Sequence, residues 1–174
     1  GPKRSGKGTI ARVIRALVGP LNVASPTLSG LALNFGLAPL IGKTVAIFAD
    51  ARLSGRADSQ VIVERLLSIS GEDAQTIDRK HLTAWHGTLP TRFVLISNEL
   101  PHLGDSSGAL PSRMVVLRLT RSFFGSEDTD LTPKLLKELP SILIWAIAGW
   151  ARLVRRGRFT QPESSLERVE ELED

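Results

Sequence analysis

The chain has 174 residues, about the size of one domain, and 42% of them are hydrophobic, which excludes a fully disordered protein. It has no cysteine, which excludes disulfides and cysteine-bound zinc and fits an intracellular protein. The longest apolar run, residues 142–151, is too short to span a bilayer and is followed by Arg152, so we expect no membrane partner.

The formal net charge of +4 conceals an uneven distribution along the chain. The last twelve residues, 163–174, hold six acids and one base, so residues 1–162 hold 21 bases and 12 acids. A basic body attracts polyanions such as nucleic acid, but many proteins simply have a basic surface. The charge alone leaves both interpretations open.

The first third of the chain predicts helices around one buried strand. Apolar residues within 10–17 recur at helical spacing, and Gly19-Pro20 ends this helix. Residues 26–42 are apolar and rich in small residues, which we interpret as a helix followed by a turn. The apolar run at 43–50 predicts a buried strand that ends at Asp50.

The rest of the chain predicts a hairpin with a basic centre, two more strands and two C-terminal helices. The expected elements are a helix capped by Asp58 and reaching about Leu67, a hairpin at 73–87, buried strands at 91–98 and 114–119, a helix after Asp130 and a longer one that Pro140 opens. Strands mixed with helices indicate an α/β sheet with a site along one edge.

The opening stretch GPKRSGKGT fits the pattern G-x-x-x-x-G-K in a loop that opens a helix. Backbone amides of such a loop cradle phosphate oxygens, and Lys7 is expected to reach the β- and γ-phosphates. Gly8 stands where a serine or threonine usually binds Mg²⁺, so either Thr9 takes over or Asp50 and water hold the metal. The residues expected to bind the nucleotide are Gly1, Ser5, Gly6, Lys7, Gly8 and Thr9.

A phosphate loop of this kind normally follows a buried strand. No such strand stands before Gly1 in this sequence, so we expect the chain to be a piece of a longer protein. The alternative is a chance glycine-rich terminus or a tag remnant at Gly1-Pro2.

Polar residues follow two of the expected strands. Asp50 ends the first and is a candidate to hold Mg²⁺ through water, while Asn98 ends the second and is a candidate to contact the γ-phosphate or the attacking water. Arg113 is a candidate for an arginine that reaches a neighbouring subunit's γ-phosphate, although an ordinary surface arginine is the simpler interpretation. The catalytic base is left open, with Glu64 and Glu72 as candidates.

The order of these stretches resembles the helicase domain of phage and plasmid primase-helicases, within the superfamily 3 helicases. The resemblance extends to about Pro162. The stretches that carry it are GPKRSGKGT, the strand ending at Asp50, LLSISGEDAQTIDRK (66–80), FVLISNELP (93–101), SSGALPSRMVVLRL (106–119) and the helical stretch 130–159. Those helicases are hexameric, AAA+-like P-loop ATPases that translocate on DNA.

The resemblance implies an ATP- and Mg²⁺-dependent DNA helicase with an AAA+-like P-loop fold and a C-terminal helical segment. It places Lys7 and Thr9 in Walker A, Asp50 in Walker B, Asn98 as the sensor and Arg113 as the finger acting in trans. It also places Gly71, Asp73 and Lys80 in a motif whose hairpin contacts DNA in the channel, where Arg79 and Lys80 are the expected DNA ligands.

The implied partners are single-stranded or forked DNA, five further copies in a hexamer, and a primase domain in the same full-length chain. The implied location is the cytoplasm of a bacterial or phage-infected cell. We divide the chain into an ATPase core (1–125), a C-terminal helical part (126–162) and an acidic tail (163–174).

Two other functions remain open on the sequence. SGKGT also resembles phosphotransferases of the adenylate-kinase type, although no lid-like insertion is visible. The position after Asp50 is Ala51, where many ATPases have a second acid, so a non-catalytic nucleotide-binding module is the other alternative. ATP turnover with and without single-stranded DNA separates the three.

Overall fold

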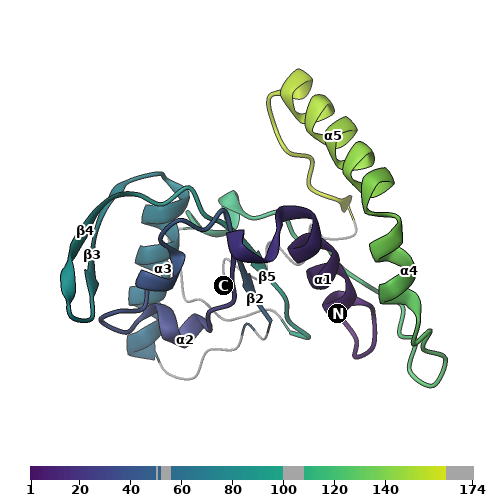
Figure 1. Ribbon diagram of the computed structural model, residues 1–174, viewed down its shortest axis with the longest axis horizontal. Coiled ribbons are helices and arrows are strands. Elements are labelled where there is room, and N and C mark those ends of the chain that lie inside the picture. Colours follow the sequence, from purple (N-terminus) through teal and green to yellow (C-terminus); the bar gives the residue numbers. More distant parts are fainter. Residues whose placement is uncertain (50, 52–55, 100–107, 164–174) are drawn as a thin grey trace.

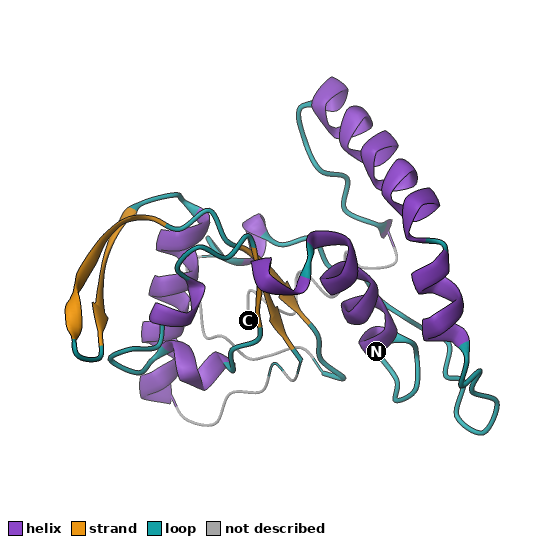
Figure 2. Ribbon diagram, in the orientation of Figure 1, coloured by secondary structure: helices purple, strands orange, loops and turns teal. Residues whose placement is uncertain are grey.

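The computed structural model describes residues 1–49, 51, 56–99 and 108–163. Three short strands in this part of the chain form a parallel sheet in the order β1 (Val23–Ala24), β2 (Val45–Phe48) and β5 (Arg92–Leu95). The protein is therefore mixed α/β with a parallel sheet and flanking helices, as the sequence predicts (Figure 2).

The first helix, α1 (Lys7–Val18), begins and ends close to where the sequence predicts. Gly6 precedes it in a left-handed conformation with φ of 88°, and Gly19 follows it with φ of 89°. Both conformations favour glycine, because a Cβ atom is strained at positive φ. Two glycines thus fix the limits of α1.

The helix followed by a turn that the sequence predicts within 26–42 is present, but the helix is short. This stretch holds only α2 (Leu28–Leu31), capped by the Thr27 side chain, and a 3₁₀ turn, η2 (Ala38–Leu40). Its small residues and Pro39 favour tight turns over a continuous helix.

The next helix, α3 (Arg56–Ser70), is longer than predicted and begins two residues before Asp58, so Asp58 lies in its first turn instead of capping it. A two-stranded antiparallel hairpin follows, made of β3 (Ala74–Arg79) and β4 (Leu82–Thr88), which confirms the prediction for 73–87. The hairpin extends from the end of the molecule opposite the N-terminus (Figure 1).

The predicted strand at 114–119 is absent from the described structure. After the 3₁₀ turn η3 (Pro111–Arg113), this segment runs without strand pairing, and Leu117 is 74% exposed. The side chain of Gln161 takes a strand neighbour's role instead, accepting from the Val116 N–H (3.0 Å) and donating to the Met114 carbonyl (2.9 Å).

The C-terminal part consists of α4 (Leu131–Lys137) and α5 (Leu139–Arg156), and both helices contact α1. The far end of α5 stands away from the body (Figure 1), and its large side chains Ile144, Trp145 and Trp150 are exposed. Among the described residues, no helix is both long and apolar enough to cross a membrane.

The core lies between the sheet and the helices α2 and α3. Phe48 at its centre is fully buried, and its ring meets that of Phe93 edge-on, with centroids 5.9 Å apart. Packing around β2 therefore fixes the edge of the sheet at which the candidate site lies.

Replacing Phe48 with alanine is expected to lower the free energy of unfolding by about 3–5 kcal/mol, because it removes a buried ring and leaves a cavity. Urea denaturation of the purified protein measures this change. Phe124, which is 79% exposed, provides the control, and Phe124→Ala is expected to change the same quantity by less than about 0.5 kcal/mol. Equal effects of the two changes would contradict the packing described.

Candidate functional site

The N-terminal loop, residues 1–6, leads directly into α1. Two of its residues are left-handed, Arg4 with φ of 57° and Gly6 with φ of 88°. Left-handed residues in such a loop turn successive backbone N–H groups to one side, which gives a concave anion-binding surface. Within the described part of the chain, the N–H groups of residues 6–9 donate no hydrogen bond.

The Lys7 ammonium lies back over this loop. It donates to the carbonyls of Gly1 (3.0 Å) and Pro2 (2.6 Å) and to the hydroxyl of Ser5 (3.0 Å), which is itself buried. A positive charge and several free N–H groups therefore meet at the start of one helix. Such an arrangement favours an anion, because the helix dipole adds a partial positive charge.

The two residues after Lys7 differ in their surroundings. A Cβ atom built on Gly8 would meet nothing within 4 Å, so this position is open. Thr9 is partly exposed in the first turn of α1, and its hydroxyl has no hydrogen-bond partner among the described residues. Thr9 thus keeps an oxygen atom available to a ligand.

The loop lies beside the end of β5. The N-terminal ammonium of Gly1 donates to the Asn98 carbonyl at 2.8 Å, so the structure brings these two predicted site residues together. The ladder between β2 and β5 continues past the strands, where Ile96 N–H donates to the Phe48 carbonyl (2.8 Å). Asn98 is exposed, and Asp50 lies outside the described residues.

A cavity of about 330 Å³ lies along α1 at the same edge of the sheet. It is lined by Arg12 and Arg15 of α1, by residues just after β1, and by Ile47 and Ala49 of the β2 region. Arg15 donates to the Ser25 hydroxyl at 3.2 Å. This cavity could not be predicted from the sequence, because its walls come from segments that are distant along the chain.

The described residues supply few ligands for a resident metal. No three histidine, aspartate or glutamate side chains gather among them. The carboxylate of Glu72, one candidate base, instead pairs with Arg92 at 2.8 Å on the surface. An Mg²⁺ ion bound to a nucleotide needs only one or two protein ligands, because phosphates and water supply the others.

The predicted DNA ligands lie at the tip of the β3–β4 hairpin. Arg79 donates from Nε and Nη2 to the Thr83 carbonyl (2.9 and 2.8 Å), so its guanidinium braces the turn. Lys80 is exposed and has no partner among the described residues. Trp85 in β4 is partly buried and packs against the hydrophobic core.

Arg113 lies at the end of α3 in the same chain. Its Nη1 atom donates to the Leu67 carbonyl (2.7 Å) and to the Ser70 hydroxyl (3.0 Å). A cation at this end of a helix also interacts favourably with the helix dipole. Arg113 therefore caps α3 in this structure, a role that the sequence did not indicate.

Residues 1–113 match the model of DUF5906, a family of unknown function. The chain belongs to the DUF5906 family. The DUF5906 match includes the N-terminal loop, the parallel sheet, the hairpin and Arg113, and it ends before α4 and α5.

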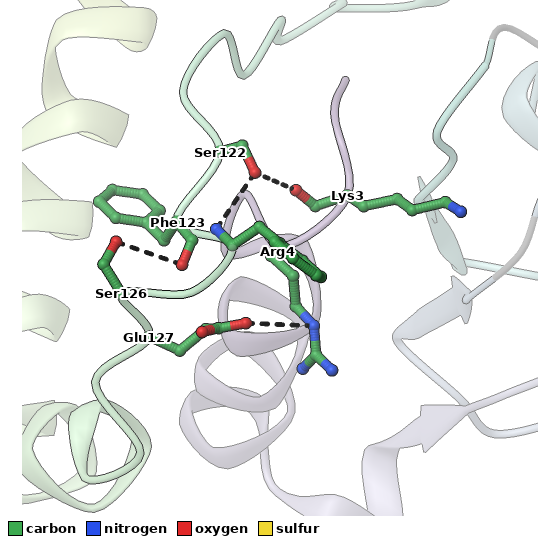
Figure 3. A network of polar contacts seen from close by, with 7 residues as sticks. Lys3, Arg4, Ser122, Phe123, Ser126 and Glu127 are labelled. Carbon is green, nitrogen blue, oxygen red and sulfur yellow. Dashed lines mark hydrogen bonds and ion pairs between the residues drawn. The ribbon is translucent and has the colours of Figure 1, made fainter.

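A segment beyond the DUF5906 match contacts the N-terminal loop. We call residues 121–127 the strap. Ser122 and Phe123 in the strap bond to the backbone of Lys3 and Arg4. Figure 3 shows the bond between Ser122 and Lys3. Sequence reasoning missed these residues because the contacts join positions 119 apart, and serine followed by phenylalanine has no distinctive pattern.

Proposed function

We propose that this protein is the ATP-hydrolysing motor domain of a DNA helicase, of the kind found in phage and plasmid primase-helicases, with an AAA+-like P-loop fold. The observation that supports it most is the meeting of the Lys7 ammonium with the free N–H groups at the start of α1. This combination suits the β- and γ-phosphates of a nucleoside triphosphate.

The proposed chemistry is hydrolysis of ATP at the γ-phosphate. The loop N–H groups and Lys7 bind and orient the phosphates, and Lys7 balances the charge that develops on them. Thr9 and Asp50 would hold Mg²⁺, which neutralises phosphate charge when it is bound. The backbone carbonyl of Asn98 bonds to Gly1 of the loop, and the Asn98 side chain is assigned to orienting the attacking water.

Titration with a fluorescent ATP analogue tests the nucleotide assignment directly. We expect saturable binding that unlabelled ATP displaces, and loss of that binding in Lys7→Ala. A wild-type protein that binds no nucleotide in the presence of Mg²⁺ would overturn the proposal. Binding without turnover would support the non-catalytic nucleotide-binding module, and turnover that requires a phosphoacceptor would support a phosphotransferase.

The DNA part of the proposal depends on the β3–β4 hairpin. Its tip presents Lys80 without a competing partner among the described residues, and Arg79 stiffens the turn beside it. An ammonium held on a rigid projection suits a phosphate of single-stranded DNA. The proposed assembly is a hexamer on single-stranded or forked DNA in the cytoplasm, with a primase domain in the full-length chain.

Lys80→Ala is expected to weaken binding of single-stranded DNA about threefold to tenfold and to leave ATP binding unchanged, because one phosphate contact is lost. Fluorescence anisotropy of a labelled oligonucleotide, measured over a series of salt concentrations, should also show a slope reduced by about one. Lys137→Ala removes another exposed lysine, in α4, and serves as the control. Unchanged affinity and slope in Lys80→Ala would exclude the hairpin tip from DNA binding.

A further inference from the structure

The strap contacts the backbone of the N-terminal loop at two successive residues. The Ser122 hydroxyl donates to the Lys3 carbonyl at 2.8 Å (Figure 3). The Phe123 N–H donates to the Arg4 carbonyl at 3.0 Å. Glu127 adds an ion pair to the Arg4 guanidinium at 3.5 Å. Three contacts thus converge on two adjacent residues of the loop.

These contacts orient the loop because each peptide group is planar. The carbonyl of one residue and the N–H of the next point in opposite directions from the same plane. Bonds from the strap to the Lys3 and Arg4 carbonyls therefore direct the N–H groups of Arg4 and Ser5 away from the strap.

The conformation of Arg4 needs such support. It is left-handed, with φ of 57°, which is unfavourable for a residue that has a Cβ atom. The strap contacts Arg4 through both its carbonyl and its side chain. Without them, Arg4 is expected to relax toward right-handed conformations, and the loop would lose its shape.

The strap is itself a fixed turn. The Ser126 N–H donates to the Phe123 carbonyl (2.9 Å), and the Phe124 N–H donates to the Ser122 hydroxyl (3.2 Å). The Arg121 guanidinium lies over the Phe123 ring, 4.8 Å from its centroid. The strap therefore offers a preorganised surface to the loop.

The strap continues into α4 through Asp128. Its carboxylate accepts from Lys134 Nζ (2.7 Å) and from the Asp130 N–H (2.9 Å), and these two bonds hold the pKa of Asp128 below its usual value. The C-terminal helices are thus tied to the loop by a short, hydrogen-bonded path.

We propose that Ser122 is a positioning residue for nucleotide binding: together with the Phe123 N–H, its hydroxyl holds the loop in the shape that receives phosphates. This inference rests on the proposed nucleotide-binding function. Ser122 and Phe123 lie beyond the DUF5906 match, whereas the loop lies within the match. Residues outside the matched region therefore set the nucleotide affinity of a loop inside it.

The test compares Ser122→Ala with Ser122→Thr in the full-length protein. Loss of one hydrogen bond is expected to raise the KM for ATP and the Kd of a fluorescent ATP analogue about fivefold, with kcat changed less than twofold. Threonine keeps the hydroxyl and should restore both values. Ser112→Ala is the matched control, because Ser112 also donates to a backbone carbonyl at 2.8 Å (that of Ala109) but lies away from the loop.

Hydrogen exchange without nucleotide provides a second measurement. The Phe123 amide, which donates to the Arg4 carbonyl, should exchange faster in Ser122→Ala than in the wild type, while the Ser112→Ala protein should match the wild type. If Ser122→Ala binds ATP and exchanges like the wild type, the inference is wrong and the proposed function stands. If the wild type binds no ATP, the proposed function fails, and the positioning role fails with it.

Discussion

Replacing Lys7 with alanine is expected to reduce ATP hydrolysis by roughly two to three orders of magnitude. The structure places the lysine ammonium over the N-terminal loop, where it bonds to Gly1, Pro2 and Ser5. Those partners are loop oxygens and not core groups, so the free energy of unfolding should change by less than about 1 kcal/mol. Steady-state phosphate release measures the first effect, and urea denaturation measures the second.

Lys43→Ala is the control for this change. Lys43 also donates to a backbone carbonyl, that of Leu21 at 2.6 Å, but it does so away from the loop. Its removal is expected to leave turnover within twofold of the wild type. Near-normal hydrolysis by Lys7→Ala would show that the loop is not a catalytic phosphate site.

Replacing Arg113 with alanine is expected to lower turnover about a thousandfold or more, if the residue acts as a finger on a neighbouring subunit. Nucleotide binding to the mutant's own loop should be preserved, because Arg113 lies at the end of α3 and not at the loop. Mixing Arg113→Ala with Lys7→Ala tests the trans arrangement. Each variant is expected to be inactive alone, and mixed rings should regain some hydrolysis where an intact loop meets an intact arginine.

The capping role of Arg113 requires its own control. Within the chain, the guanidinium bonds to Leu67 and Ser70, so Arg113→Ala also removes a helix cap worth about 1 kcal/mol. Ser70→Ala weakens the cap but leaves the arginine in place, and it should keep most of the turnover. If Arg113→Ala hydrolyses ATP at the wild-type rate, Arg113 is not a finger and its only role is to cap α3.

Much of the fold could be predicted from local patterns. The helix at 7–18 and the hairpin at 74–88 have clear periodicity and turn residues, and both are confirmed. The strand expected at 114–119 is mostly apolar, as β2 is, yet it lacks a paired neighbour in the described structure. Strand formation depends on a partner elsewhere in the chain, which composition does not reveal.

The candidate site also has one part that local sequence predicts and another part that depends on distant residues. The N-terminal loop and the helix that it opens could be predicted from a compact motif, because glycine and lysine at this spacing are typical of a loop at a helix start. Phosphate binding by this loop stays a prediction. The contacts of Ser122 with Lys3 and of Arg113 with Leu67 depend on tertiary folding across many residues. Local sequence carries no signal for them, so only the structure reveals the strap and the cap.

ATP turnover by the full-length protein, measured with and without single-stranded DNA, tests the proposed motor function most directly. We expect hydrolysis that needs no phosphoacceptor, rises when single-stranded DNA is added, and is lost in Lys7→Ala. Hydrolysis that is absent, or that is unchanged by saturating DNA, would contradict the proposal that this protein is a DNA-dependent motor.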